Sequence, residues 1–487
     1  MEPKHTKAKI IHSLFWKLME RGGTQGIQFI VQIVLARLLL PKDFGAIAII
    51  VVFISFAQVF VQSGFNTALI QNKEVNEVDF SSVFYLSLAV AAILYVIIYF
   101  SAPFIASFYE QPILIPTLRV LSITLFIGAF NSIQNAYVAH NMLFKRLFIS
   151  SLGAIIISGT IGIVSAYSGW GVWALVAQQL SNQLTVAIIL WFTVKWRPQL
   201  IFSFKRVKIL FAYGSKLLAS SLINTLYNDL RTLIIGRMYT PEMLGFYNRG
   251  QQFPNIIVAN INGSIQSIML PVFSAHQDNK KRVKEIMRRA IVTSSFLIFP
   301  MMIGMAVVAE PLVEIVLTDK WLPAVPYLQM FCITYALMPI HTANLQAIKA
   351  MGRSDIFLRL EIIKKVIGLI ILGISLPFGI YAISLGQVFS GIISMFINAH
   401  PNKQLLEYSY KEQWVDIIPS LLIAIAMGAI VYSINYLELV AWKLLILQVC
   451  VGVALYFILA KIFKIESMSY LVTTLKQLLN DRKGKIA

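Results

Sequence analysis

The chain has 487 residues, of which 58% are hydrophobic and 13% are charged, and its mean hydropathy is +0.74. A soluble protein of this length could not bury that much apolar surface, so the composition excludes a large soluble enzyme and favours a protein that crosses a membrane many times. The net charge of +19 does not indicate a nucleic-acid partner, because the Lys and Arg residues lie between apolar segments, where anionic lipid and membrane insertion explain them.

Apolar stretches long enough to span a bilayer recur along the whole chain, at about 20 residues per span. Because backbone groups find no water in the bilayer core, runs this long predict helices. The basic N-terminus is not followed by the short apolar region and cleavage site of a signal peptide, so we expect an uncleaved first helix. We expect about fourteen spans, at residues 14–36, 45–67, 81–103, 117–139, 148–168, 172–194, 210–235, 244–270, 290–317, 325–347, 357–377, 380–400, 416–435 and 439–463.

The loops predict the orientation of these helices. Residues 195–208, 280–289 and 461–485 are rich in Lys and Arg, and with fourteen helices all three segments lie on the side of the N-terminus. Cytoplasmic loops carry an excess of Lys and Arg, so we expect both termini in the cytoplasm. The loops are short and leave no extramembrane domain for a catalytic site, and we therefore expect that the protein is not an enzyme.

The sequence also lacks the motifs that hold metals, phosphates or catalytic nucleophiles. The six histidines show no metal-ligand spacing, and no P-loop, GxSxG or HExxH pattern occurs. The two cysteines, Cys332 and Cys450, lie in apolar stretches, which argues against a disulfide framework. We expect no bound cofactor or metal, with a coupling cation or proton as the one further candidate.

One short motif occurs twice. Residues 35–49 read "LARLLLPKDFGAIAI" and residues 235–249 read "IGRMYTPEMLGFYNR", so Arg, Pro and Gly recur at an offset of 200. Six expected helices separate the copies, an even number, so both copies face the same side as a parallel repeat. We therefore expect an all-α polytopic fold with two six-helix lobes and two additional helices, divided at residues 1–205, 206–408 and 409–487.

Polar residues recur every three or four positions on the helices that flank both copies of the motif, which places them on one helix face. Polar groups facing lipid are costly, so these stripes face protein or water. Interhelical hydrogen bonding is the alternative, but it needs only one or two such groups per helix. We expect a water-filled central cavity between the lobes, lined by Arg21, Thr24, Gln25, Gln28, Gln62, Asn66, Lys216, Asn224, Asn228, Arg231, Gln252, Asn255 and Asn262.

The side chains in these stripes indicate the cargo. Amides and hydroxyls match sugar hydroxyls, and cations such as Arg21 and Arg231 match a diphosphate. Asp229 has no basic residue one helical turn away, so its partner must be on another helix; we expect a structural ion pair, with ion coupling as the alternative. Glu361 is followed at i+3 and i+4 by Lys364 and Lys365 and should be neutralised in place.

Longer segments resemble a known family. "LARLLLPKDFGAIAIIVVFISFAQVFVQSGFNTALIQ", "DLRTLIIGRMYTPEMLGFYNRGQQFP", "LVEIVLTDKWLPAVPYLQ" and "QAIKAMGRSDIFLRLE" resemble Wzx-type bacterial polysaccharide exporters, and within that class the colanic-acid and teichuronic-acid exporters. The resemblance implies membership of the MOP superfamily, with twelve core helices plus two. It also implies transfer of an undecaprenyl-diphosphate-linked oligosaccharide across the bacterial cytoplasmic membrane by alternating access. Its implied partners are that lipid-linked oligosaccharide, membrane lipids and, as a further candidate, a polysaccharide polymerase or export machinery.

Three other functions compete with this interpretation. A MATE-type drug or cation antiporter would need acidic residues in the cavity, whereas the expected lining has one clear acid, Asp229, against several cations. A lipid II flippase of the same superfamily would differ in the sugar it carries rather than in its mechanism. A membrane glycosyltransferase or polymerase would need a sizeable loop or domain outside the cytoplasm, which the short loops do not provide.

Overall fold

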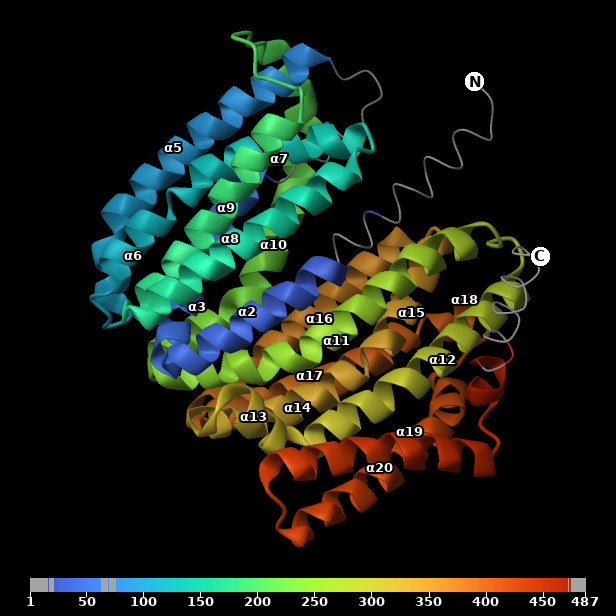
Figure 1. The fold of residues 1–487 in the computed structure, drawn as a ribbon. Helices are drawn as coiled ribbons and strands as arrows, with labels where there is room; N and C mark the ends of the chain where they lie inside the picture. The colour runs from blue at the N-terminus through green and yellow to red at the C-terminus, as the bar shows by residue number, and fades with distance from the viewer. Residues whose placement is uncertain (1–15, 17–21, 63–68, 70–75, 472, 474–487) are drawn as a thin grey trace, which may run out of the picture. The chain divides into compact units, whose positions relative to one another are not determined.

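The computed structural model describes residues 16, 22–62, 69, 76–471 and 473, and in this part of the chain the secondary structure is helical, without a strand (Figure 1). The chain divides by packing into two compact units, Met1–Gly245 and Phe246–Ala487. The boundary lies within a helix, and α19 and α20 belong to the second unit. The division at residues 1–205, 206–408 and 409–487 that the sequence predicts stays a prediction.

The first unit consists of long apolar helices joined by short turns. The α8 helix packs along both α2 and α9, and α5 packs along α7 (Figure 1). Glycine permits the close approach of α8, because a Cβ at Gly159 would lie 2.7 Å from Val31 of α2. The helices are α2 (Thr24–Leu38), α3 (Pro41–Gln62), α5 (Glu77–Phe108), α6 (Leu114–Leu121), α7 (Thr124–His140), α8 (Phe144–Tyr167), α9 (Val172–Thr193) and α10 (Phe204–Met238).

The second unit begins within α11 and ends with an antiparallel hairpin of two helices, α19 and α20 (Figure 1). Ion pairs attach this hairpin to α12, with Lys284 Nζ 3.1 Å from Glu412 and Arg288 Nε 2.9 Å from Asp416. The elements are α11 (Pro241–Ser274), α12 (Lys280–Val307), α13 (Ala309–Leu317), η2 (Asp319–Ala324), α14 (Val325–Ala336), α15 (Met338–Ala350), α16 (Ser354–Ser375), η3 (Leu376–Phe378), α17 (Ile380–Ala399), α18 (Asn402–Leu405), α19 (Tyr410–Ser433), η4 (Ile434–Leu437) and α20 (Ala441–Ile462).

The described helices confirm a polytopic membrane protein. Eleven helical segments are long and apolar enough to cross a membrane, and twelve if the bent helix α10, with its 52° break between Phe211 and Gly214, is one span. Two further predicted spans fall on helices that do not meet this test. The described part of the first, α2, has 15 residues, and α16 contains five charged residues in its first twelve positions. The count of fourteen therefore stays a prediction.

The two copies of the repeated motif contact each other at the starts of α3 and α11. A Cβ at Gly45 would lie 1.7 Å from the carbonyl oxygen of Pro241, and a Cβ at Gly245 would lie 2.2 Å from that of Pro41. Each glycine thus lies against the proline of the other copy. The reciprocal contact gives a physical reason for the repeat, because only a residue without a Cβ permits this backbone approach on either side.

An ion pair and two hydroxyls fix the chain that leads into α10. Asp79, at the buried start of α5, accepts hydrogen bonds of 2.7 Å from both Nε and Nη2 of Arg206. In the segment before this arginine, the backbone N–H of Gln199 donates to the hydroxyl of Ser81, and that of Ser203 donates to the hydroxyl of Ser82. These contacts hold the 194–203 segment against α5 and so position α10 within the first unit.

Candidate functional site

Five helices of the first unit line a polar pocket of about 350 Å³. The lining residues come from α2, α3, α7, α8 and α9, and none of the described lining residues is charged. Three are aliphatic, namely Val51, Ile54 and Ile155. The other ten carry amides or hydroxyls: Gln28, Gln32, Ser55, Gln58, Thr124, Ser158, Gln178, Gln179, Asn182 and Gln183.

Hydrogen bonds between helices hold part of this wall in place. Gln32 Nε2 on α2 donates to Gln178 Oε1 on α9 over 3.5 Å, a long contact. Asn182 Nδ2 on α9 donates to the hydroxyl of Ser158 on α8 over 3.1 Å. These bonds satisfy polar groups that would otherwise be costly inside a membrane-spanning bundle, and they restrict the orientation of the amides around the pocket.

A glycine shapes the wall on the side of α3 and α7. Gln58 Nε2 donates to the carbonyl oxygen of Thr124 over 2.9 Å, and its Oε1 accepts from Gln62 Nε2 at 2.5 Å. The side chain of Gln58 lies against Gly128, where an added Cβ would be only 2.4 Å from its Oε1. Gln62, one of the predicted lining residues, therefore supports the wall through Gln58 instead of lining the pocket.

Asp229 contacts this region through a hydrogen bond. The hydroxyl of Ser55, which lines the pocket, donates to Asp229 Oδ2 over 3.3 Å. Among the described residues Asp229 forms no ion pair, and this hydrogen bond comes from another helix; the expected structural ion pair and the alternative role in ion coupling both stay predictions. The prediction for Glu361 is confirmed, because Lys364 Nζ lies 2.6 Å from its carboxylate.

The other predicted residues of α2 and α3 have different surroundings. Thr24 is buried, and Gln25 is half-buried with an Oε1 that has no hydrogen-bond partner in the described part of the chain. Gln28 is exposed and is the one predicted lining residue that the polar pocket contains. Arg21 and Asn66 lie outside the described residues.

The predicted residues on α10 lie mostly at the surface of the helix. Lys216, Asn224 and Asn228 are exposed. Arg231 is half-buried, and its guanidinium carbon lies 5.7 Å from the centre of the Tyr227 ring, within the range of a cation–π contact. Exposure is compatible with a position on a water-filled cavity, and the assignment of these residues to such a cavity stays a prediction.

The predicted residues on α11 belong to the second unit. Gln252 Oε1 accepts a hydrogen bond from Arg249, a buried arginine that also lies 5.4 Å from the centre of the Trp321 ring. Asn255 is exposed, whereas Asn262 is buried with an Oδ1 that has no partner among the residues described. Gln252 is therefore engaged by a neighbouring cation, and Asn255 is the most exposed residue of the three.

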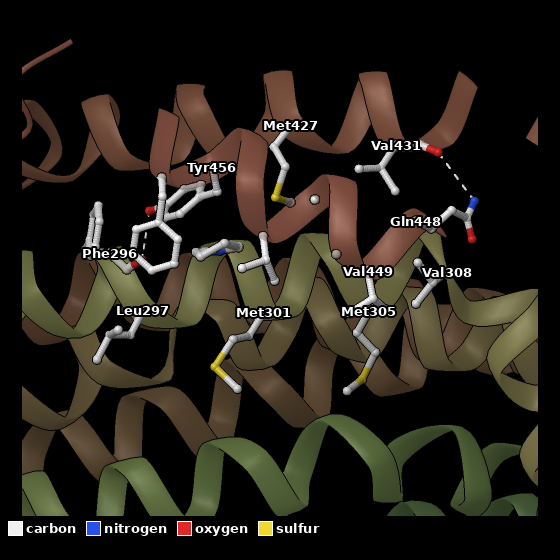
Figure 2. A pocket seen from close by; sticks show the side chains of 15 residues that line it. Phe296, Leu297, Met301, Met305, Val308, Met427, Val431, Gln448, Val449 and Tyr456 are labelled. Carbon is white, nitrogen blue, oxygen red and sulfur yellow. Dashed lines mark hydrogen bonds between the residues drawn. The ribbon is translucent and has the colours of Figure 1, made fainter. Parts of the chain in front are cut away.

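The second unit contains an apolar pocket of about 300 Å³ between α12, α19 and α20 (Figure 2). Two of its polar groups are engaged: the Tyr456 hydroxyl donates to the carbonyl of Phe296 over 2.7 Å, and Gln448 Nε2 donates to the carbonyl of Val431 over 3.3 Å (Figure 2). Gln448 Oε1 has no hydrogen-bond partner in the described part of the chain. Aliphatic and thioether side chains form the remaining walls, among them Leu297, Met301, Met305, Met427 and Val449. The pocket therefore matches hydrocarbon and offers little to a polar ligand.

The sequence analysis did not identify the contribution of α9. This helix supplies four of the pocket's amides, at positions 178, 179, 182 and 183. The signal was present as the run "QQLSNQ", which gives α9 a hydropathy of 1.3, among the lowest of the candidate spans. The predicted stripes were on helices that flank the repeated motif, and α9 is not one of those helices.

Comparison with known proteins identifies the family. Residues 34–326, more than half of the chain, match the family described as "Polysaccharide biosynthesis protein". The chain belongs to this family. The matched segment includes α3, α7, α8 and α9 in full, but it begins within α2, after the lining residues Gln28 and Gln32.

Curated relatives extend over most of the chain. It is 28% identical over 427 residues to the teichuronic acid biosynthesis protein TuaB of Bacillus subtilis, covering 84% of this chain and 86% of the relative. It is 23% identical over 440 residues to the lipopolysaccharide biosynthesis protein WzxC of Escherichia coli, covering 87% and 88%. The resemblance to Wzx-type exporters that the sequence suggested is confirmed.

Solved structures show the same fold at low sequence identity. An inward closed conformation of the lipid II flippase MurJ superposes with a TM-score of 0.74 at 15% identity, covering 93% of this chain and 98% of that one. An inward-facing multidrug resistance MATE transporter of the MOP superfamily gives a TM-score of 0.60 at 15% identity, covering 78% and 96%. The protein therefore has the fold of the MOP superfamily.

Proposed function

We propose that the protein is a flippase that moves an undecaprenyl-diphosphate-linked oligosaccharide across the bacterial cytoplasmic membrane for the synthesis of a surface polysaccharide. The observation that carries this proposal is the match of residues 34–326 to the polysaccharide biosynthesis family. Relatives named for teichuronic acid and lipopolysaccharide biosynthesis, each matched over more than four fifths of this chain, support it.

The physical problem of this transport explains the polar groups inside an apolar protein. Each sugar hydroxyl that enters hydrocarbon without a hydrogen-bond partner costs several kcal/mol, roughly 4–8 on a water-to-cyclohexane scale. A protein path lined by amides and hydroxyls replaces the lost water, and the polar pocket offers such groups, among them Gln58 and Asn182 on helices long and apolar enough to span the membrane. The prenyl tail needs no polar path, because it stays in lipid throughout.

Arginine and lysine side chains predicted to line the central cavity are proposed to hold the diphosphate. Arg21 and Arg231 present planar guanidinium groups that match phosphate oxygens in pairs, and Lys216 adds a third positive charge. Asp229 is the proposed coupling carboxylate, because it lies in a membrane-spanning helix and is held only by a hydroxyl from Ser55 among the described residues. Alternating access between two lobes would carry the headgroup from the inner to the outer leaflet, as the MOP fold permits.

The proposed topology has fourteen spans with both termini in the cytoplasm. The basic segments between α9 and α10, at the start of α12 and after α20 then share the cytoplasmic side, where Lys and Arg are favoured. A polysaccharide polymerase on the opposite side of the membrane is the proposed recipient of the transported unit, since a repeat unit must be joined to others after it crosses.

The first test is the lipid-linked oligosaccharide profile of a strain that lacks the protein. Mass spectrometry should detect a diphosphate-linked repeat unit that accumulates while the surface polymer disappears, and plasmid-borne protein should restore both. If peptidoglycan precursors accumulate instead, the protein is a lipid II flippase. If neither lipid nor polymer changes, the proposed cargo is wrong.

A further inference from the structure

We infer that the polar pocket lined by α2, α3, α7, α8 and α9 binds an uncharged sugar residue of the lipid-linked oligosaccharide. This inference rests on the proposed function and specifies which part of the cargo this pocket recognises. It lies within the first unit, and the described residues that line it include none of the cations proposed to hold the diphosphate. Four helices besides α2 supply its polar groups, so the pocket is built from the packed bundle and not from a single polar stripe.

The chemistry of the lining matches hydroxyl groups. An amide side chain carries one acceptor oxygen and a donor NH2 group, and a sugar hydroxyl both donates and accepts, so neighbouring amides can bond each hydroxyl in two directions. The pocket wall has seven amide side chains and three hydroxyls. Such a set recognises a ring with several hydroxyls, and it discriminates against apolar ligands, which would leave these groups unpaired.

Two amides are available for a ligand. Gln28 and Gln179 line the pocket, and neither side chain forms a hydrogen bond with another residue that the structure describes. By contrast, Gln32, Gln58 and Asn182 are already bonded to neighbouring helices. The bonded amides form a fixed frame, and the two available amides, from α2 and α9, are in position to bond a ring between them.

The described lining residues are uncharged, which favours a neutral ligand over a cation or an acidic sugar. The described lining itself carries no carboxylate to offset the charge of a cation, and Asp229 is linked to it by the hydrogen bond from Ser55. An acidic sugar would need Arg or Lys, and none of the described residues that line the pocket supplies either. A neutral ring needs neither, so it is the ligand that this lining fits.

The size of the pocket agrees with this ligand. A volume of about 350 Å³ is at the lower end of the range of roughly 300–1,000 Å³ for small-molecule pockets. One molecule in liquid water occupies about 30 Å³, so the pocket has about ten times the volume of a single water. This is more than a single bound ion requires. The pocket therefore has room for one sugar ring with some ordered water.

The test compares two probes on the full-length protein in lipid nanodiscs. One is the lipid-linked oligosaccharide extracted from the deletion strain, and the other is undecaprenyl diphosphate without sugar. The variant is Gln28→Leu combined with Gln179→Leu, which removes the two available amides at similar side-chain size. The matched control is Gln199→Leu, an exposed glutamine in the segment before α10, outside the pocket.

The wild type should bind the oligosaccharide probe more tightly than undecaprenyl diphosphate. The double variant should bind the oligosaccharide probe about tenfold more weakly, equivalent to about 1.4 kcal/mol, with unchanged affinity for undecaprenyl diphosphate. Unchanged affinity for diphosphate also shows that the variant is folded. The control should match the wild type with both probes.

Three results would overturn the inference. If the double variant binds both probes as tightly as the wild type does, the pocket does not bind a sugar residue. An equal loss for both probes would assign the two glutamines to the diphosphate or to the fold. A change confined to the sodium or proton dependence of probe binding would make the pocket a cation site. If the wild type binds neither probe and the deletion strain accumulates no lipid-linked oligosaccharide, the proposed function is wrong, and this inference, which rests on it, is wrong as well.

Discussion

Substitution of Gly45 by alanine should disrupt the contact between the two copies of the repeated motif. The added Cβ would lie 1.7 Å from the carbonyl oxygen of Pro241 and 2.5 Å from its carbonyl carbon. Both atoms belong to the backbone at the start of α11, so no side-chain rotation relieves the overlap. To reach 3.0 Å, below which Cβ contacts are essentially never seen, the two helix starts must separate by about 1.3 Å.

The expected cost follows from this displacement. Insertion of one carbon into a well-packed contact typically costs about 1–3 kcal/mol, and a clash with backbone should lie at the upper end, about 2–3 kcal/mol. For a unit of this size each kcal/mol lowers Tm by about 2–4 °C, so we expect a decrease of about 4–12 °C. Gly245→Ala should act in the same direction but less strongly, because its Cβ would lie 2.2 Å from the Pro41 carbonyl oxygen.

Thermal unfolding of the purified protein in detergent measures this effect, and the surface polymer of a complemented deletion strain measures its consequence for function. Gly26→Ala on α2 is the matched control, since an added Cβ there meets nothing within 4 Å. It should unfold at the wild-type temperature or slightly above, because alanine favours helix by about 1 kcal/mol over glycine. If Gly45→Ala and Gly26→Ala have the same Tm, the reciprocal contact of the two motifs does not stabilise the protein.

Three further predictions test other parts of the molecule. Asp79→Asn should lower the free energy of unfolding by about 1–3 kcal/mol, since it removes the charge that Arg206 bonds at a buried site; thermal unfolding checks it, and an unchanged Tm would contradict it. Arg21→Ala combined with Arg231→Ala should abolish polymer export while the protein stays in the membrane. Full export by the double variant at normal expression would show that transport needs neither arginine. A reporter fused to the C-terminus should be active only in the cytoplasm; an extracytoplasmic signal would refute fourteen spans with both termini in the cytoplasm.

Local patterns were sufficient to predict the helices. Hydropathy located the segments that became α3, α5 and α8, because a helix in lipid satisfies its backbone within the segment and needs no distant partner. The i+3 spacing of Glu361 and Lys364 likewise predicted an ion pair, since that spacing places both on one helix face. Where the local signal is mixed, as in α16 with its charged first half, hydropathy alone did not settle whether the helix spans the membrane.

The candidate site depended on contacts that the local pattern does not contain. The polar stripe on α2 identified Gln28, but not that it shares a pocket with Gln179 of α9, about 150 residues later in the chain. The sequence did not show that Gln62 donates to Gln58, whose side chain lies against Gly128 on α7, and its place on the predicted central cavity stays a prediction. Similarly, the local pattern did not show that a serine on α3 donates a hydrogen bond to Asp229.

The sequence by itself determined that this chain is an all-helical membrane protein, which of its residues are polar, and that one motif occurs twice. Only the tertiary structure decided that the two motifs meet at Gly45 and Gly245 and which polar faces form a pocket. The physical reason is that helix formation in lipid is driven by interactions within about one turn. Helix association there has no hydrophobic driving force and depends on close packing and hydrogen bonds between residues far apart in the chain.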